Sequence, residues 1–132
     1  MKGITKLMFD EFKIAEVGMD FMGFKLNKND IMTYHHLIIP KRNGGLVTRS
    51  NGALIQRVPH DYLNIIEMID PTRFAYITSE MIDINVKGFI DPYNIKNIHA
   101  ILDEFEAIHD GETTRKGKQL IKREYKQGRV VL

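Results

Sequence analysis

Two short segments rich in β-forming residues limit the possible folds of this chain most. They interrupt a sequence whose other segments have helical patterns. Residues 33–39 have the sequence TYHHLII and residues 52–58 have the sequence GALIQRV; both compositions favour extended backbone. The polar stretch between them, residues 40–51, contains a proline and a Gly-Gly pair, as expected of a long hairpin connection. We therefore expect an α+β fold that is mostly helical and contains one small β-hairpin.

The remaining segments have apolar residues at intervals of three or four and clear signals for helix starts. An aspartate at the cap position followed by proline at the first helical position favours the beginning of a helix. Such pairs occur at Asp70-Pro71 and Asp91-Pro92. The predicted helices cover residues 4–17, 59–70, 71–86, 91–109 and 114–126.

Composition indicates a single globular domain. The chain has 132 residues, 43% of them apolar and 27% charged, which argues against general disorder. We place a motif core at residues 33–70, between the N-terminal helix (residues 4–17) and a C-terminal helical region (residues 71–127). No apolar run approaches the length of a membrane span, and the N-terminus lacks the apolar core of a signal peptide. We therefore expect a cytoplasmic protein with no membrane partner.

Cysteine usage and basic residues limit the possible ligands. The chain has no cysteine, so any metal must take nitrogen and oxygen ligands. The net charge of +2 is too small to indicate nucleic-acid binding, but residues 113–129 contain seven basic residues and one acidic residue. This clustering predicts either a phosphate-facing surface or an ordinary solvated helix. The candidate phosphate and nucleic-acid contacts are Lys41, Arg42, Arg49, Arg57, Arg115, Lys118 and Lys122.

Four polar residues come together if the hairpin folds onto the helix that follows it. These are His35 and His36 on the first strand, Asn51 at the start of the second, and His60 in the helix. Alternation along a strand sends the two adjacent histidines to opposite faces. Asn64 follows His60 by four residues, so both lie on one helical face and can share a metal ion. Taken singly, each residue also has a structural interpretation as a turn, surface or helix-start residue.

The other histidines and the acids of the motif helix have simpler interpretations. His99 and His109 fall in the long helix over residues 91–109, away from the motif, and are interpreted as structural or surface residues. Asp61 and Glu67 are interpreted as first-turn and surface acids of the helix over residues 59–70.

The spacing of the motif resembles that of the HNH endonuclease family, whose ββα-metal core contains the same elements. The resemblance covers residues 34–66. The family has a His-His or Asp-His pair, a proline, Gly-Gly four residues later, an asparagine six residues after the second glycine, and a histidine nine residues after the asparagine. Pro40, Gly44-Gly45, Asn51 and His60 occupy these positions with the same gaps.

The resemblance implies a role for each residue. His36 would be the general base that deprotonates a water for attack on the phosphate. His35 and His60, together with Asn64, would hold one divalent cation, such as Mg²⁺, Mn²⁺, Ni²⁺ or Zn²⁺. Asn51 would brace the hairpin and orient the base. An imidazole suits proton transfer at neutral pH, and one cation can stabilise the charged transition state.

The sequence departs from the family pattern in two places. Gln56 and Pro59 occupy positions of zinc-binding cysteines, so the flanking helices must hold the scaffold. Three residues, 37–39, separate His36 from the proline, where the family usually has two. Either a β-bulge absorbs the extra residue, which we favour, or the register slips, placing His36 among the metal ligands and Leu37 at the base position.

The predicted function is that of a metal-dependent HNH-type endonuclease that hydrolyses DNA. The resemblance also suggests a phage or mobile-element origin, and so the cytoplasm of a bacterial or phage-infected host cell. The alternative is a non-catalytic module with the same scaffold that binds nucleic acid or protein, for example in phage counter-defence. A ribonuclease would use the same site, so RNA is a third interpretation. Nicking by a monomer and double-strand cutting by a homodimer both remain open.

Overall fold

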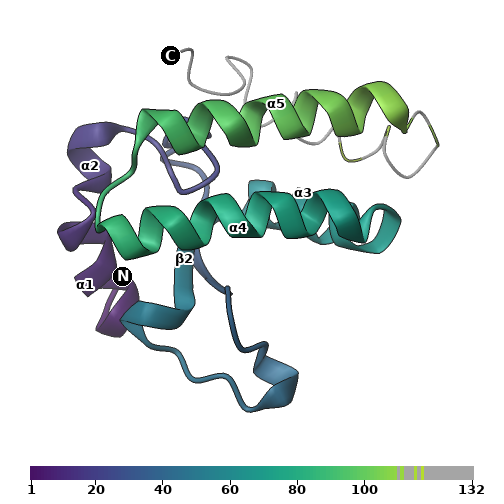
Figure 1. Cartoon of the computed structure of the whole chain (residues 1–132). Helices are drawn as coiled ribbons and strands as arrows, with labels where there is room; N and C mark the ends of the chain where they lie inside the picture. Colours follow the sequence, from purple (N-terminus) through teal and green to yellow (C-terminus); the bar gives the residue numbers. More distant parts are fainter. Residues whose placement is uncertain (110, 112–114, 116, 118–132) are drawn as a thin grey trace.

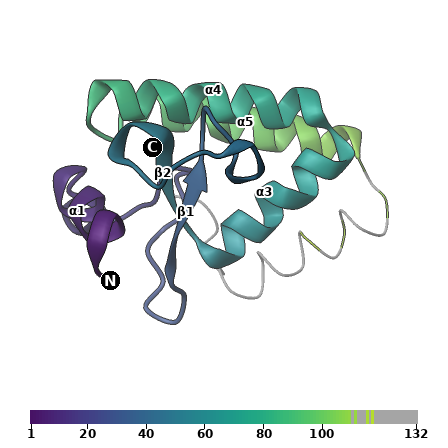
Figure 2. The same cartoon turned by 90° about the horizontal axis from the view of Figure 1, so that it is seen from below.

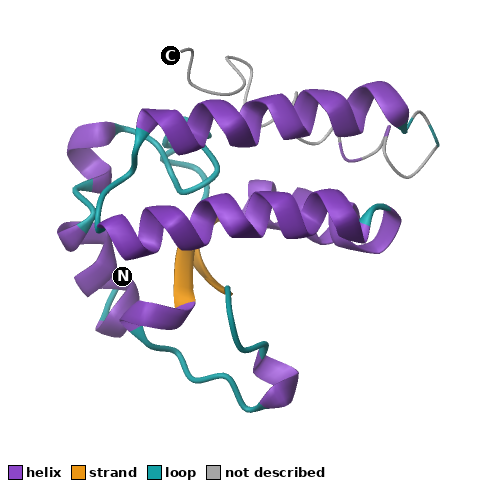
Figure 3. Cartoon of the chain, in the orientation of Figure 1, coloured by secondary structure: helices purple, strands orange, loops and turns teal. Residues whose placement is uncertain are grey.

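Five α-helices and a two-stranded antiparallel sheet form the described part of this computed structural model, which covers residues 1–109, 111, 115 and 117 (Figure 1). The predicted α+β, mostly helical class is confirmed (Figure 3). The predicted basic helix over residues 114–126 lies almost entirely outside the described residues. The helices are α1 (Gly3–Glu11), α2 (Ile14–Val17), α3 (Arg57–Ile69), α4 (Pro71–Lys87) and α5 (Pro92–Ile108), and the strands are β1 (Met32–His36) and β2 (Gly52–Gln56).

The two predicted strands pair as expected, but both are shorter than their predicted ranges. The register runs without interruption from Met32 opposite Gln56 to His36 opposite Gly52. The extra residue therefore does not form a β-bulge in this pair, and that prediction is wrong. It lies instead in the connecting loop (residues 37–51), which projects away from the helices in Figure 1 and contains two short 3₁₀ helices, η1 (Lys41–Asn43) and η2 (Arg49–Asn51).

The N-terminal segment forms two helices, where the periodicity predicted one over residues 4–17. The break is at Lys13, whose backbone is left-handed with a φ of 53°. This turn lets the side chains on both sides of it reach the core: Phe12 is 1% exposed and Ile14 is fully buried. Burial of two large apolar side chains outweighs the cost of one residue in a left-handed conformation.

The predicted boundaries of the later helices agree with the structure to within two residues. The carboxylate of Asp70 accepts a hydrogen bond from the backbone N–H of Arg73 at 3.1 Å, and that of Asp91 accepts one from Tyr93 at 3.0 Å. Each aspartate thereby satisfies one of the free amides at a helix start. α4 and α5 lie side by side, and α3 packs against α4 and both strands (Figures 1 and 2).

A single apolar cluster joins the hairpin to the helices, and a buried polar cluster ties the hairpin to residues 20–27. The Asp20 carboxylate is fully buried and accepts hydrogen bonds from the backbone amides of Met22, Phe24 and Gln56 and from the Gln56 side chain. The Gln56 side-chain oxygen accepts in turn from the backbone amide of Asn27 at 2.7 Å. Along the described part of the chain, no helix combines the length and apolar character needed to cross a membrane.

Candidate functional site

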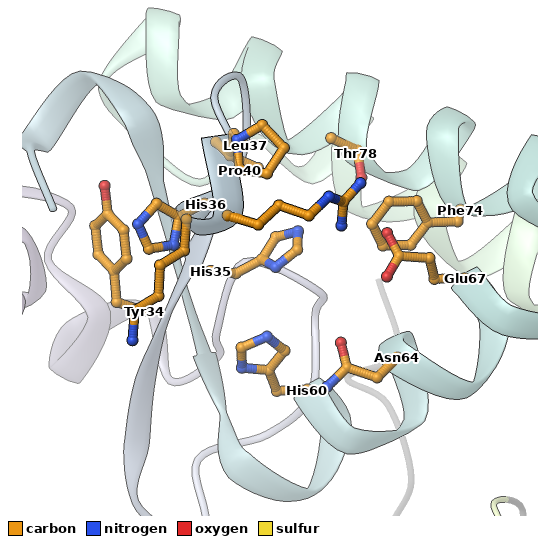
Figure 4. Close-up of a pocket in the computed structure, with 12 residues that line it drawn as sticks. Tyr34, His35, His36, Leu37, Pro40, His60, Asn64, Glu67, Phe74 and Thr78 are labelled. Atoms are coloured by element: carbon orange, nitrogen blue, oxygen red, sulfur yellow. The ribbon is translucent and has the colours of Figure 1, made fainter. Parts of the chain in front are cut away.

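A cavity of about 670 Å³ lies between β1, the connecting loop, α3 and α4, and four of the five predicted catalytic and metal-binding residues line it (Figure 4). Its size is in the range of sites for small ligands. Imidazole, amide, carboxylate and cationic side chains surround it together with apolar ones. The lining residues are Tyr34, His35, His36, Leu37, Pro40, Lys41, Arg42, His60, Asn64, Glu67, Phe74 and Thr78.

The two adjacent histidines leave opposite faces of β1, as the alternation of a strand predicts. The His35 ring meets the His60 ring edge-on, with 5.1 Å between centroids and an interplanar angle of 81°. The His36 ring instead lies 5.0 Å from the Tyr34 ring, at 84°. In Figure 4, His35 and His60 point toward each other while His36 lies beside Tyr34. His35, and not His36, therefore lies beside His60 of α3, which is the arrangement expected without a slip in register.

Hydrogen bonds fix the tautomer of His60. The Thr33 hydroxyl lies 2.6 Å from the carbonyl oxygen of Ile55 and 2.8 Å from Nδ1 of His60. Because a threonine hydroxyl has one proton, which it donates to the carbonyl, it accepts from the N–H at Nδ1 of His60. A neutral ring protonated at Nδ1 has its lone pair on Nε2. His60 therefore presents an unprotonated Nε2, as histidine ligands of metals do.

Burial favours the neutral form of the His35 and His60 imidazoles. Burial, together with the smaller effects of the neighbouring His60 and His36, lowers the pKa of His35 to about 4. Burial also lowers the pKa of His60, with a smaller opposing effect from Asp61. Nε2 of His35 and Nε2 of His36 are both buried without a hydrogen-bond partner. Such atoms are rare in native proteins and call for an explanation.

α3 contributes three polar side chains to the cavity, at intervals of four and three residues. His60 and Asn64 are there as predicted, and Glu67 joins them on the same helical face. In Figure 4 all three side chains project from α3 toward β1. The interpretation of Glu67 as a simple surface acid is therefore incomplete, because it is exposed and also lines the cavity. The spacing 60, 64, 67 was the signal that could have identified it.

Asn51 holds the connecting loop next to the end of β1. Its side-chain oxygen accepts hydrogen bonds from the backbone amides of Ile38 and Ile39, each at 2.9 Å. Its side-chain amide donates to the carbonyls of Ile39 at 3.0 Å and Leu46 at 3.3 Å. At Gly45 a Cβ atom would lie 1.9 Å from the Ile39 carbonyl oxygen, which explains a glycine at this position.

The predicted basic contacts divide into different environments. Lys41 and Arg42 are exposed and line the cavity. Arg49 does not line it: its guanidinium donates to the Glu11 carboxylate at 2.9 Å and to the backbone and side-chain oxygens of Asn85, each at 2.8 Å. Arg49 thus joins the loop to α1 and α4. Of the remaining residues, Arg57 and Arg115 are exposed outside the cavity lining, and Lys118 and Lys122 lie outside the described residues.

The side chains that line the cavity include nitrogen and oxygen donors of the types that divalent cations accept. Nε2 of His35 is buried without a partner, and Nε2 of His60 carries a lone pair, with the Asn64 amide and the Glu67 carboxylate close by on α3. Imidazole nitrogens and amide or carboxylate oxygens suit several first-row divalent metals. Within residues 1–109, 111, 115 and 117, no three His, Asp or Glu side chains gather as a ready-made metal cluster.

Comparisons of the chain with protein-family models, with curated proteins and with solved structures find no match.

Proposed function

We propose that this protein is a metal-dependent endonuclease of the HNH type that hydrolyses DNA phosphodiester bonds. One observation carries the proposal: adjacent residues of β1, His35 and His36, both have a buried, unpartnered Nε2 and both line the same cavity. A buried polar atom without a partner costs stability, so its presence at a cavity favours a role in binding or chemistry.

On the α3 side of β1, His35 and His60 would hold the cation, with the Asn64 side-chain oxygen as a further ligand. When bound, a divalent cation supplies Lewis-acid stabilisation of the charge that develops on the phosphate and on the leaving oxygen. The hydrogen bond between His60 and Thr33 fixes which ring nitrogen faces the cavity. Lys41 and Arg42, at the cavity rim, would bind the flanking phosphates.

On the other side of β1, His36 would act as the general base. It would take a proton from the attacking water, and the Tyr34 ring edge beside it restricts the orientation of the imidazole. Asn51 fixes the backbone of residues 38–39, which are separated from His36 by one residue. In this proposal the cation would bind on one face of β1 and the proton would be accepted on the other.

Plasmid cleavage tests this proposal. Supercoiled DNA is incubated with the full chain and Mg²⁺, Mn²⁺ or Ni²⁺, and His36→Ala is compared with the wild type. We expect the variant to cleave at least about 100-fold more slowly, the usual contribution of a general base. The matched control is His109→Gln, which changes a histidine that bonds to Asp70 outside the cavity. Unchanged cleavage by His36→Ala would contradict the assignment of the base.

The absence of a ready-made cluster of three His, Asp or Glu side chains among the described residues favours a second candidate, a non-catalytic module that binds nucleic acid or protein. The same assay separates the two functions. DNA binding together with a lack of cleavage in all three metals would support the binding module.

A further inference from the structure

The connecting loop (residues 37–51) exposes four aliphatic side chains within ten residues of sequence. Ile38 is 61% exposed, Ile39 50%, Leu46 73% and Val47 53%. Single exposed apolar residues are common on protein surfaces, whereas several together mark interaction sites. These four residues are called the apolar rim below.

The backbone of the apolar rim is held in place by hydrogen bonds, so its side chains are presented without a large ordering cost. The Asn51 side-chain amide donates hydrogen bonds to the backbone carbonyls of Ile39 and Leu46, which lie in the two halves of the loop. The Tyr34 hydroxyl accepts from the backbone amide of Thr48 at 3.0 Å and donates to its carbonyl at 2.7 Å. A binding loop that is ordered before it meets its partner loses less entropy on association.

Charge around the apolar rim favours a polyanion as the partner. The sequence has no Asp or Glu between Asp30 and Asp61. Lys41 and Arg42 form η1 of the loop with Asn43, and both are exposed. Branched aliphatic side chains next to Lys41 and Arg42 match the surface of a nucleic-acid duplex, where apolar side chains contact sugars and base edges and cations contact phosphates.

We propose that the connecting loop enters a groove of duplex DNA, with the apolar rim against sugars and base edges and with Lys41 and Arg42 on the phosphates. This inference rests on the proposed function and extends it by naming the part of the chain that binds the DNA substrate. Pro40, Lys41 and Arg42 belong to both the loop and the cavity lining. A groove occupied by the loop therefore brings a backbone phosphate to the cavity with the histidines.

Binding of a fluorescent 20-base-pair duplex to the full chain, in EDTA, tests the loop without requiring cleavage. We expect the double variant Ile38→Ser/Leu46→Ser to bind about tenfold more weakly than the wild type, because the burial of aliphatic side chains is lost. The salt dependence of its affinity should stay unchanged. The matched control is Met68→Ser/Val86→Ser, which changes two exposed side chains of α3 and α4, 67% and 77% exposed.

The cationic part of the loop is expected to respond differently in the same assay. The double variant Lys41→Gln/Arg42→Gln should lower the slope of log affinity against log salt by roughly 2, one phosphate contact for each cation. Wild-type affinity in Ile38→Ser/Leu46→Ser would overturn the proposal, and so would binding of the loop to a protein in place of DNA. Loop-dependent binding by a chain that cleaves in no metal would support the loop and overturn the endonuclease. Cleavage by a chain whose DNA binding does not depend on the loop would support the endonuclease and overturn the proposal for the loop.

Discussion

Two buried polar clusters contact the same hairpin, and they differ in how their hydrogen-bonding groups are satisfied. At the Gln56 end of the sheet, the Asp20 carboxylate accepts hydrogen bonds from three backbone amides and one side-chain amide. At the cavity, Nε2 of His35, Nε2 of His36 and Oγ1 of Thr78 are buried with no partner. The Asp20 carboxylate therefore finds its hydrogen-bond partners within the protein, whereas these three atoms of cavity-lining residues have none among the described residues.

We interpret the Asp20 cluster as structural and propose that the cavity histidines are functional. Fully bonded buried groups stabilise one arrangement of the chain, whereas unbonded groups lower stability and are kept where they serve a site. Substitutions in the Asp20 cluster should therefore affect folding, and substitutions among the cavity histidines should affect binding with little effect on folding.

Asp20→Ala should lower the free energy of unfolding by about 3 kcal/mol, because the amides of Met22, Phe24 and Gln56 lose their acceptor in a buried place. Urea unfolding followed by circular dichroism measures the change. The control is Asp61→Ala, an exposed aspartate of α3, for which we expect a change within about 0.5 kcal/mol. Equal stability of the two variants would remove the distinction between the clusters.

Asn51→Ala should lower the free energy of unfolding by about 2 kcal/mol, since it removes the acceptor of two loop amides and a donor to two carbonyls. It should also loosen the loop, so amides of residues 38 and 39 should exchange with deuterium faster. Protection unchanged at these two amides would show that the Asn51 side chain does not hold the loop in solution.

His35→Leu should leave the free energy of unfolding within about 1 kcal/mol of the wild type, because it replaces a buried unpartnered nitrogen by apolar atoms beside Phe74. The same variant should lose affinity for Mn²⁺, which isothermal titration calorimetry measures. A loss of several kcal/mol in stability, with Mn²⁺ affinity intact, would assign His35 to the scaffold.

Local sequence signals predicted the later helices and the hairpin well. Asp70-Pro71 and Asp91-Pro92 start helices as expected, because capping depends on adjacent residues only. The break at Lys13 was missed, since burial of Phe12 and Ile14 is decided by packing against the rest of the chain. Long-range contacts of this kind leave no periodic signal in the segment itself.

The predicted strand over residues 33–39 was too long for a similar reason. The segment 37–39 is rich in good strand formers. However, the backbone amides of Ile38 and Ile39 donate hydrogen bonds to the Asn51 side chain and not to a neighbouring strand. The structure brings His35, His36, His60 and Asn64 to one cavity and excludes Arg49, whose partners come from α1 and α4. A charged residue's partner across the fold cannot be read from composition.

The most direct test of the central claim is the position of a cation in the cavity. Crystals of the full chain grown or soaked with Mn²⁺ give an anomalous difference peak that locates the ion independently of any activity. If His35 and His60 hold the cation, the peak lies within bonding distance of Nε2 of both residues, about 2.0–2.3 Å for such ligands. A cavity without a peak at saturating Mn²⁺, or an ion bound away from both imidazoles, would contradict this claim.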